Sequence, residues 1–254
     1  MSRAIRGGLV VLVSSVLLGL WEVSVRGWGV PEYLLPPPSR IAIKFWQTLP
    51  VQAGQLGFTA ATTLAGLAAA LVIGVLLALT VTYIRPLRAL VLPAFAAFNG
   101  IPKIAVAPLL VTWFGLGAEP KVFLAFLLAL FPIFVNAATG LSEIDPDMID
   151  LARLSGGSEL RIFRKIRLMN ALPYLADALK VAFPLALVGA IVGEFIGGNR
   201  GIGQLILSGQ FNLDTPLVFA CLLSITLFTS LGIGAIALFE KVFLRWRLSV
   251  RGKS

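Results

Sequence analysis

The sequence contains no histidine and a single cysteine, Cys221, among its 254 residues. These absences exclude metal sites built from histidine and cysteine, base catalysis by imidazole, disulfide bonds within the chain and Cys-His nucleophiles. The phosphate-binding pattern G-x-x-x-x-G-K-[ST] is also missing, so the chain is not a P-loop ATPase by itself. We therefore predict no catalytic residue, no metal site and no cofactor, and we expect any ATP that drives the protein to bind a partner chain.

Charged residues are scarce as well, at 13% of the chain, whereas 58% of the residues are hydrophobic. An ordinary globular domain is about 25% charged and roughly 45–50% apolar. The chain thus has too little polar surface to enclose a water-soluble core, and we predict a polytopic membrane protein. At roughly 20 apolar residues per spanning helix, the length leaves room for about half a dozen spans and for no sizeable soluble domain.

Six apolar runs are long enough to span a bilayer. Only helices and closed barrels satisfy the backbone in lipid, and no period-two alternation appears, so we predict an all-α fold and one transmembrane domain over residues 1–254. The runs cover residues 9–25, 58–83, 89–114, 122–138, 176–196 and 216–239. The first run is expected to be an uncleaved signal anchor. The third is interrupted at residues 99–103, so it is either one span or a short span preceded by a helix at the membrane edge.

The formal charge of +9, from 21 Lys and Arg against 12 Asp and Glu, is interpreted as a sign of orientation and not of nucleic-acid binding. Six spans place both termini on one side. Cytoplasmic termini put fourteen basic residues inside and five outside, which favours this orientation. The inner residues are Arg3, Arg6, Arg85, Arg88, Arg153, Arg161, Arg164, Lys165, Arg167, Lys241, Arg245, Arg247, Arg251 and Lys253, and the outer ones are Arg26, Arg40, Lys44, Lys121 and Arg200.

Local patterns predict how two regions pack. Small residues at four-residue spacing permit close approach of helices in lipid, and we expect them to pack the bundle or a dimer interface. In the outer loop, Ser39 follows three prolines and is expected to cap a short helix through Phe45. The small residues are Gly66, Ala70, Gly74 and Ala78 in the second span and Gly189, Gly193 and Gly197 in the fifth.

The largest predicted cytoplasmic loop, residues 141–175, contains a short helix with clear boundaries. Asp145 is a good N-cap, Pro146 suits the first helical position, and Gly156-Gly157 ends the helix after about two turns. A helix this short is not stable alone in water, so the bundle or a partner must hold it. Its apolar side is predicted to face the cytoplasm as a docking surface. That side consists of Met148, Leu151, Ala152 and Leu154.

A second helix follows, with Ser158 as its predicted cap, and the two helices together resemble a known motif. The permease subunits of bacterial ABC importers share E-A-A, three residues, G, nine residues, I, one residue, L-P. Here Asp150-Leu151-Ala152 occupies the E-A-A position, Gly156 follows at the same distance, and Ile166-Arg167-Leu168 is in register. Leu151 replaces the first alanine and Met169 the final proline, while Pro173 resembles a second proline of the family.

Further segments resemble the nitrate, sulfonate and taurine branch of these permeases, which includes relatives associated with pyrimidine and other vitamin precursors. The resemblance implies a type I importer in the bacterial inner membrane: two copies of the permease, cytoplasmic ATPase subunits and an extracytoplasmic binding protein. It implies a small anion, such as a sulfonate, taurine or nitrate, as the solute, with a vitamin precursor as the alternative. The segments are residues 35–39, 108–115, 131–133, 193–195 and 201–203.

The resemblance also implies which residues contact the ATPase. These are Asp150, Leu151, Ala152, Arg153, Leu154, Ser155, Gly156 and Gly157. Four polar residues in or beside the spans are candidates for the pathway or a gate: Glu194, Asn99, Lys103 and Asn136. A carboxylate in the path would repel an anion, so for Glu194 we favour a gate or a hydrogen bond between helices. For the other three, hydrogen bonding between helices is favoured over a place in the path.

Two other classes of function remain as alternatives. A secondary transporter driven by an ion gradient is expected to have paired acidic or histidine relays and an internal repeat, and the sequence shows little of either. An intramembrane enzyme requires clustered nucleophile motifs at membrane depth, and none is found.

Overall fold

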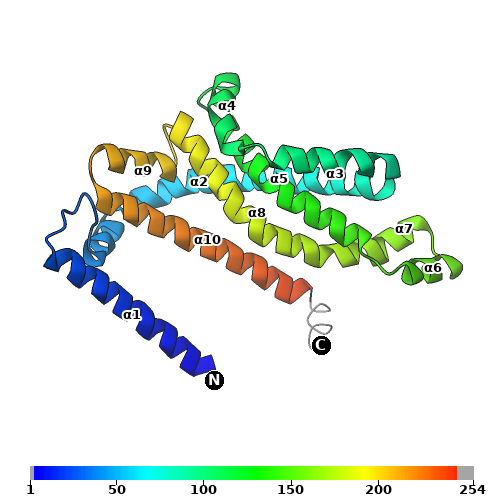
Figure 1. Ribbon diagram of the computed structural model, residues 1–254, viewed down its shortest axis with the longest axis horizontal. Helices are drawn as coiled ribbons and strands as arrows, with labels where there is room; N and C mark the ends of the chain where they lie inside the picture. Colours follow the sequence, from blue (N-terminus) through cyan, green and yellow to red (C-terminus); the bar gives the residue numbers. More distant parts are fainter. Residues whose placement is uncertain (1–2, 245–254) are drawn as a thin grey trace.

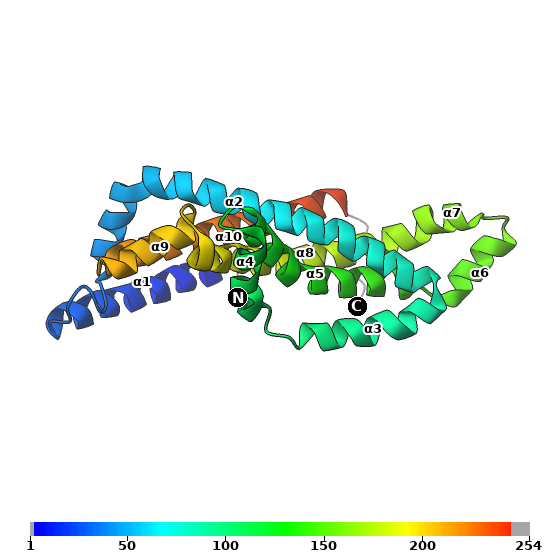
Figure 2. The ribbon, with the colours of Figure 1, turned by 90° about the horizontal axis from the view of Figure 1, so that it is seen from above.

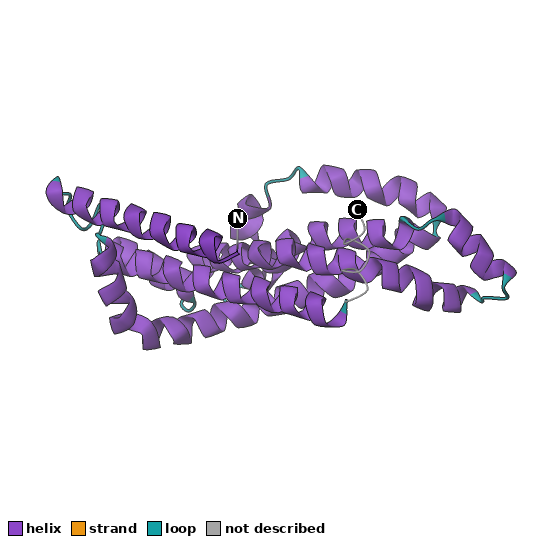
Figure 3. Ribbon diagram, turned by 90° about the horizontal axis from the view of Figure 1, so that it is seen from below, coloured by secondary structure: helices purple, strands orange, loops and turns teal. Residues whose placement is uncertain are grey.

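The computed structural model describes residues 3–244, and every regular element in that range is a helix (Figures 1 and 3). The predicted all-α fold is therefore confirmed. The basic residues Arg245, Arg247, Arg251 and Lys253, which support the predicted orientation, lie outside the described residues.

Twelve helical elements follow one another in the described part of the chain, and they differ widely in length. They are α1 (Arg3–Gly27), α2 (Pro38–Tyr83), α3 (Arg85–Asn99), η1 (Lys103–Val106), α4 (Ala107–Phe114), α5 (Glu119–Ser142), α6 (Pro146–Leu154), α7 (Glu159–Ile162), η2 (Phe163–Arg167), α8 (Leu168–Gly197), α9 (Ile202–Phe211) and α10 (Thr215–Phe243). The element η2 is a π-helix that joins α7 to α8 without a break.

Four helices are long and apolar enough to cross a membrane: α2, α5, α10 and the continuous helix Glu159–Gly197. A fifth crossing is formed if Pro86–Asn99 and Lys103–Phe114, which meet at 80°, count as one broken span. The predicted interruption at residues 99–103 is thus the point where the third run bends. The first run lies in the 25-residue helix α1, and a total of six spans stays a prediction.

The molecule is elongated, with most helices running along its length (Figures 1 and 2). Helices α6 and α7 lie at one end, which we call the α6 end. The turn between α1 and α2 and the helix α9 lie at the opposite end, the α9 end. The most extensive contacts join α5 to α8 and to α2, so these three helices form the centre of the bundle.

Small residues allow these three helices to approach closely, as predicted. The small residues at four-residue spacing in α2 and in α8, which we call the small-residue stripes, are all buried. A Cβ added to Gly66 would lie 2.5 Å from the Cβ of Ala125, and one added to Gly189 would lie 2.7 Å from the carbonyl group of Leu124. The stripes therefore pack helices within this chain.

Replacing Gly66 with alanine is expected to destabilise the bundle by about 1–3 kcal/mol, because the new methyl group overpacks the contact between α2 and α5. The matched control is Gly57→Ala in the same helix, where nothing lies within 4 Å of the added Cβ. Thermal unfolding of the purified protein in detergent measures the difference. Equal midpoints for the two variants would show that this contact is not tightly packed.

The predicted short helix at Ser39 is wrong. Ser39 is instead near the start of α2, a helix of 46 residues that begins at Pro38. The interior Pro50 does not end the helix, and Figure 2 shows α2 bending near its N-terminal end. Ser39 does not cap this helix; its amide and hydroxyl groups donate to the carboxylate of Glu22, at 3.0 and 2.8 Å.

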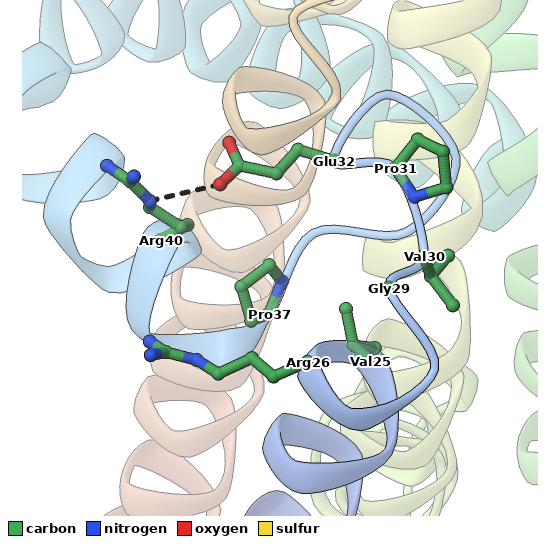
Figure 4. A pocket seen from close by; sticks show the side chains of 8 residues that line it. All are labelled: Val25, Arg26, Gly29, Val30, Pro31, Glu32, Pro37 and Arg40. Atoms are coloured by element: carbon green, nitrogen blue, oxygen red, sulfur yellow. Dashed lines mark ion pairs between the residues drawn. The ribbon is translucent and has the colours of Figure 1, made fainter.

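A cavity of about 420 Å³ lies beside this junction of α1 and α2 (Figure 4). Arg26 and Arg40 contribute its positive charge. Both are paired with carboxylates, Arg26 with Glu22 at 2.6 Å and Arg40 with Glu32 at 3.1 Å. We infer that these ion pairs stabilise the turn between α1 and α2.

Candidate functional site

The helix α6 begins and ends as its sequence predicts. The carboxylate of Asp145 accepts a hydrogen bond from the amide of Asp147 at 3.0 Å, and Pro146 is the first helical residue. At the other end Gly156 has φ +76°, a left-handed conformation that favours glycine. The amide of Gly157 then donates to the carbonyl of Ala152 at 2.9 Å, which closes the C-terminus with a Schellman-type bond.

Apolar side chains of α6 project into open space at the α6 end. The exposed fractions are 55% for Met148, 66% for Leu151 and 88% for Leu154, and no residue of α6 is buried. Ala152 is half-buried and instead faces a cavity of about 340 Å³ shared with α7 and η2. A contiguous apolar surface without cover in a short helix is typical of a site for another protein.

The two helices of the loop are linked by an ion pair. The guanidinium of Arg153 lies 2.9 Å from the carboxylate of Glu159 and 3.6 Å from that of Asp150. The hydroxyl of Ser158 accepts a hydrogen bond from the amide of Arg161 at 3.4 Å, so the predicted cap of the second helix is confirmed. The two helices of the loop are therefore held in a defined arrangement.

A second set of bonds fixes the loop to the bundle. The amide nitrogen of the Asn170 side chain donates to the carbonyls of Gly140 at 2.8 Å and Glu143 at 3.0 Å. The guanidinium of Arg167 donates to the carbonyl of Leu141 at 2.8 Å and lies over the ring of Tyr83. These carbonyls belong to the last turn of α5 and the residue after it, so the end of α5 is tied to the start of α8.

Replacing Gly157 with alanine is expected to open the C-terminus of α6, because the new Cβ would lie 2.6 Å from the carbonyl oxygen of Ala152. Amide hydrogen exchange over residues 146–157 should become roughly tenfold faster. The control is Gly156→Asn, since asparagine tolerates a left-handed backbone and nothing lies within 4 Å of the added Cβ. Unchanged exchange in the Gly157 variant would contradict this description of the helix end.

Glu194 is fully buried near the opposite end of α8. One carboxylate oxygen accepts a hydrogen bond from the hydroxyl of Thr59 in α2 at 2.7 Å, and the other accepts from the amide of Gly203 in α9 at 2.8 Å. The structure thus places Glu194 in contacts between helices. A role in gating stays a prediction.

Lys121 lies close to Glu194 and has no role predicted from the sequence. Its side chain is buried in the first turn of α5, with its ammonium group 2.7 Å from the carbonyl of Gly117, 3.3 Å from that of Leu116 and 3.5 Å from that of Gly197. The ammonium group thus interacts with the partial negative charge of carbonyl oxygens at the end of α8 and in the turn before α5. A lysine at the start of an apolar run is also typical of a simple membrane-edge anchor, so the sequence alone does not indicate this contact.

The other candidate residues lie elsewhere. The ammonium group of Lys103 donates to the side-chain oxygen of Asn99 at 2.6 Å, across the bend between α3 and η1. Asn136 donates to the carbonyl of Pro132 within α5, at 2.8 Å. The described contacts therefore bring Asn99 and Lys103 together but join neither of them to Asn136 or Glu194, and their place in a pathway stays a prediction.

Charged residues also link α8 to α10, and this link is not predicted from the sequence. Lys180 pairs with Asp177 at 3.1 Å and with Glu240 in α10. The three-residue spacing of Asp177 and Lys180 indicates a pair on one helix face. The contact with Glu240, sixty residues away, depends on how the two helices pack.

Residues 70–245 match a protein family described as "Binding-protein-dependent transport system inner membrane component". The riboflavin transport system permease protein RibX of Chloroflexus aurantiacus is 35% identical over 92% of this chain and 88% of its own length. The formylaminopyrimidine transport permease protein ThiX of Halalkalibacterium halodurans is 35% identical, covering 91% and 93%. A putative aliphatic sulfonates transport permease protein, SsuC of Bacillus subtilis, is 26% identical, covering 95% and 88%.

The fold is also similar to a solved structure. A chain of the MetNI methionine ABC transporter, solved in inward-facing conformations, superposes with a TM-score of 0.60 and 21% sequence identity. The superposition covers 82% of this chain and 98% of that one.

Proposed function

The chain belongs to the family of binding-protein-dependent transport system inner membrane components, as an ABC importer permease with the type I fold, and we propose that Asp150–Gly157 bind its partner ATPase. Membership of this family makes the chain a transport subunit and not an enzyme. ATP hydrolysis takes place on a separate chain, in keeping with the missing phosphate-binding loop.

The observation that best supports this proposal is the exposed apolar side of α6 on a rigid support. Leu151 and Leu154 are available to fill a cleft in another protein. The bonds of Arg167 and Asn170 join the loop to the ends of α5 and α8. Closure of an ATPase pair that holds α6 would then move these two helices as rigid bodies.

The proposed orientation follows from where this surface lies. The ATPase is cytoplasmic, so the α6 end with its loop 141–175 faces the cytoplasm, and the α9 end faces outward. Basic residues in the loop agree with the positive-inside rule. They are Arg153, Arg161, Arg164, Lys165 and Arg167. We propose that both termini are cytoplasmic and that residues 1–254 form one domain in the bacterial inner membrane.

The proposed complex contains two copies of this chain, two ATPase subunits and an extracytoplasmic binding protein. The name of the family itself implies dependence on a binding protein. A type I importer has two permease subunits around one pathway, and this chain accounts for one of them. We propose that an identical copy supplies the other.

The proposed solute is a heteroaromatic vitamin or vitamin precursor. Relatives named for riboflavin and formylaminopyrimidine transport share 35% of their residues with this chain over more than 90% of its length. The sulfonate and taurine permeases SsuC of Bacillus subtilis and TauC of Escherichia coli share 26%, so the small anion expected from the sequence becomes the second candidate.

Uptake into proteoliposomes that contain the permease, its ATPase and its binding protein tests these proposals. We expect ATP-dependent uptake of labelled riboflavin or formylaminopyrimidine in preference to taurine, and no uptake when ATP is replaced by a non-hydrolysable analogue. Preference for taurine would instead support a small anion as the solute. Uptake driven by an ion gradient without the ATPase would support a secondary transporter and contradict the proposed function.

A further inference from the structure

A single helix connects the two ends of the molecule that the proposed function assigns to different partners. The start of α8 carries Asn170, which bonds the end of α5. Asn170 lies in the loop of residues 141–175, which we call the coupling loop. The last turn of α8 carries Glu194, which contacts α2 and α9 at the opposite end. The helix is continuous with η2 and α7 and so reaches from Glu159 to Gly197 without a break.

The beginning of α9 is held by side chains from other helices. The amide of Gly201 donates to the side-chain oxygen of Gln55 at 2.7 Å, that of Ile202 donates to the hydroxyl of Thr59 at 2.9 Å, and that of Gly203 donates to Glu194. The first amides of a helix have no partner within it. In α9 three successive amides are therefore satisfied by α2 and α8.

The carboxylate of Glu194 also fits sterically against this turn. A Cβ added to Gly201, which has φ +112°, would lie 2.1 Å from the carboxyl carbon of Glu194. A Cβ added to Gly203 would lie 2.9 Å from one of its oxygens. Only glycine at both positions lets the backbone of α9 approach the carboxylate so closely.

These contacts should resist movement of α9 relative to α2 and α8. A buried carboxylate that loses its donors is left with a large desolvation penalty. Thr59 serves both neighbours at once, since it donates to Glu194 and accepts from Ile202. A displacement of α9 must therefore either expose Glu194 or carry α8 with it.

The far end of α9 is open to a partner. Phe211, the last residue of α9, is 84% exposed, and Leu213, in the turn before α10, is 67% exposed. The next residue, Asp214, pairs with Lys44 of α2 at 2.5 Å. The turn is thus an exposed surface attached to the same helix that supplies Thr59.

We propose that Glu194 and Thr59 are positioning residues that fasten α9 to α8 and α2, so that docking of the binding protein at the α9 end is transmitted along α8 to the coupling loop. This inference rests on the proposed function, because it requires the ATPase at α6 and the binding protein at the opposite end. Neither residue belongs to the segment Asp150–Gly157 that is proposed to bind the ATPase, and the proposal requires neither to contact the solute.

The test compares ATPase rates of the reconstituted importer with and without its binding protein. Glu194→Gln removes the charge, and Thr59→Val removes the hydroxyl while keeping the shape. Both are expected to reduce the stimulation by the binding protein on the order of tenfold, with the basal ATPase rate and the assembly of the complex unchanged. Thr59→Ser keeps the hydroxyl and is expected to keep the stimulation, so this matched pair remains decisive even if Glu194→Gln fails to assemble.

Several outcomes would overturn the inference. Normal stimulation in Glu194→Gln and Thr59→Val would do so, as would a wild-type importer whose ATPase does not respond to the binding protein. Parallel loss of basal rate, stimulated rate and thermal stability in both variants would show a purely structural role. Failure of the ATPase to associate with the wild-type permease is a different result, because it contradicts the proposed function itself.

Discussion

Replacing Leu154 with glutamate should nearly abolish ATP-dependent uptake, because it places a charge at the most exposed apolar position of α6. This side chain is 88% exposed in the isolated chain, so the substitution has little effect on folding. A buried anchor of an interface typically contributes 2 kcal/mol or more, and its loss should weaken ATPase binding at least about thirtyfold. Co-purification of the ATPase with the permease measures this directly, and uptake should fall with it.

The matched control for this prediction is Leu160→Glu. Leu160 lies in α7 of the same loop and is 64% exposed, but it falls outside the proposed contact at Asp150–Gly157. Its replacement is expected to leave ATPase binding within about twofold of the wild type, as for a residue peripheral to a binding hot spot. Equal loss in the two variants would mean that the contact is wider than proposed or that charge alone repels the ATPase.

Replacing Asn170 with leucine should uncouple transport from ATP hydrolysis. The variant removes the donor that serves the carbonyls of Gly140 and Glu143, and so loosens the loop from α5 while leaving the surface of α6 intact. We expect the ATPase to bind normally and the amount of solute imported per ATP to fall roughly tenfold, since both hydrogen bonds of this side chain to the end of α5 are lost.

The neighbouring variant Met169→Ala is the control for this second prediction. Met169 is 42% exposed, and its truncation leaves the bonds of Asn170 in place. Simultaneous measurement of solute uptake and phosphate release in proteoliposomes gives the coupling ratio for both variants. A normal ratio in Asn170→Leu would show that the loop transmits motion without this attachment.

Features set by neighbouring residues could be predicted from the sequence. The bounds of α6 follow from Asp145, Pro146 and Gly156, because caps and left-handed glycines act within a few residues. The small-residue stripe around Gly66 predicts close packing, since spacing along a helix determines which residues share a face. The break after Asn99 is likewise a local signal.

Features that depend on distant segments could not be predicted. Thr59 and Glu194 are separated by 135 residues, so no spacing along the chain indicates that they meet. The N-terminal part of α2 is not predicted, because three prolines and a polar stretch suggest a loop, whereas the side chain of Gln52 is buried and accepts a hydrogen bond from Ser224 of α10. The orientation of the chain in the membrane is a proposal that rests on the position of the α6 surface and on the distribution of basic residues.

The most direct test of the central claim is a photocrosslink from α6 to the ATPase. Because Cys221 is the single cysteine, Cys221→Ala provides a background in which Leu154→Cys carries a photoreactive group, with Phe211→Cys at the opposite end as control. We predict an adduct between the permease and the ATPase from position 154 and none from position 211. Absence of an adduct at 154 in a complex that contains the ATPase, or an equal adduct at 211, would contradict the assignment of Asp150–Gly157 as the coupling surface.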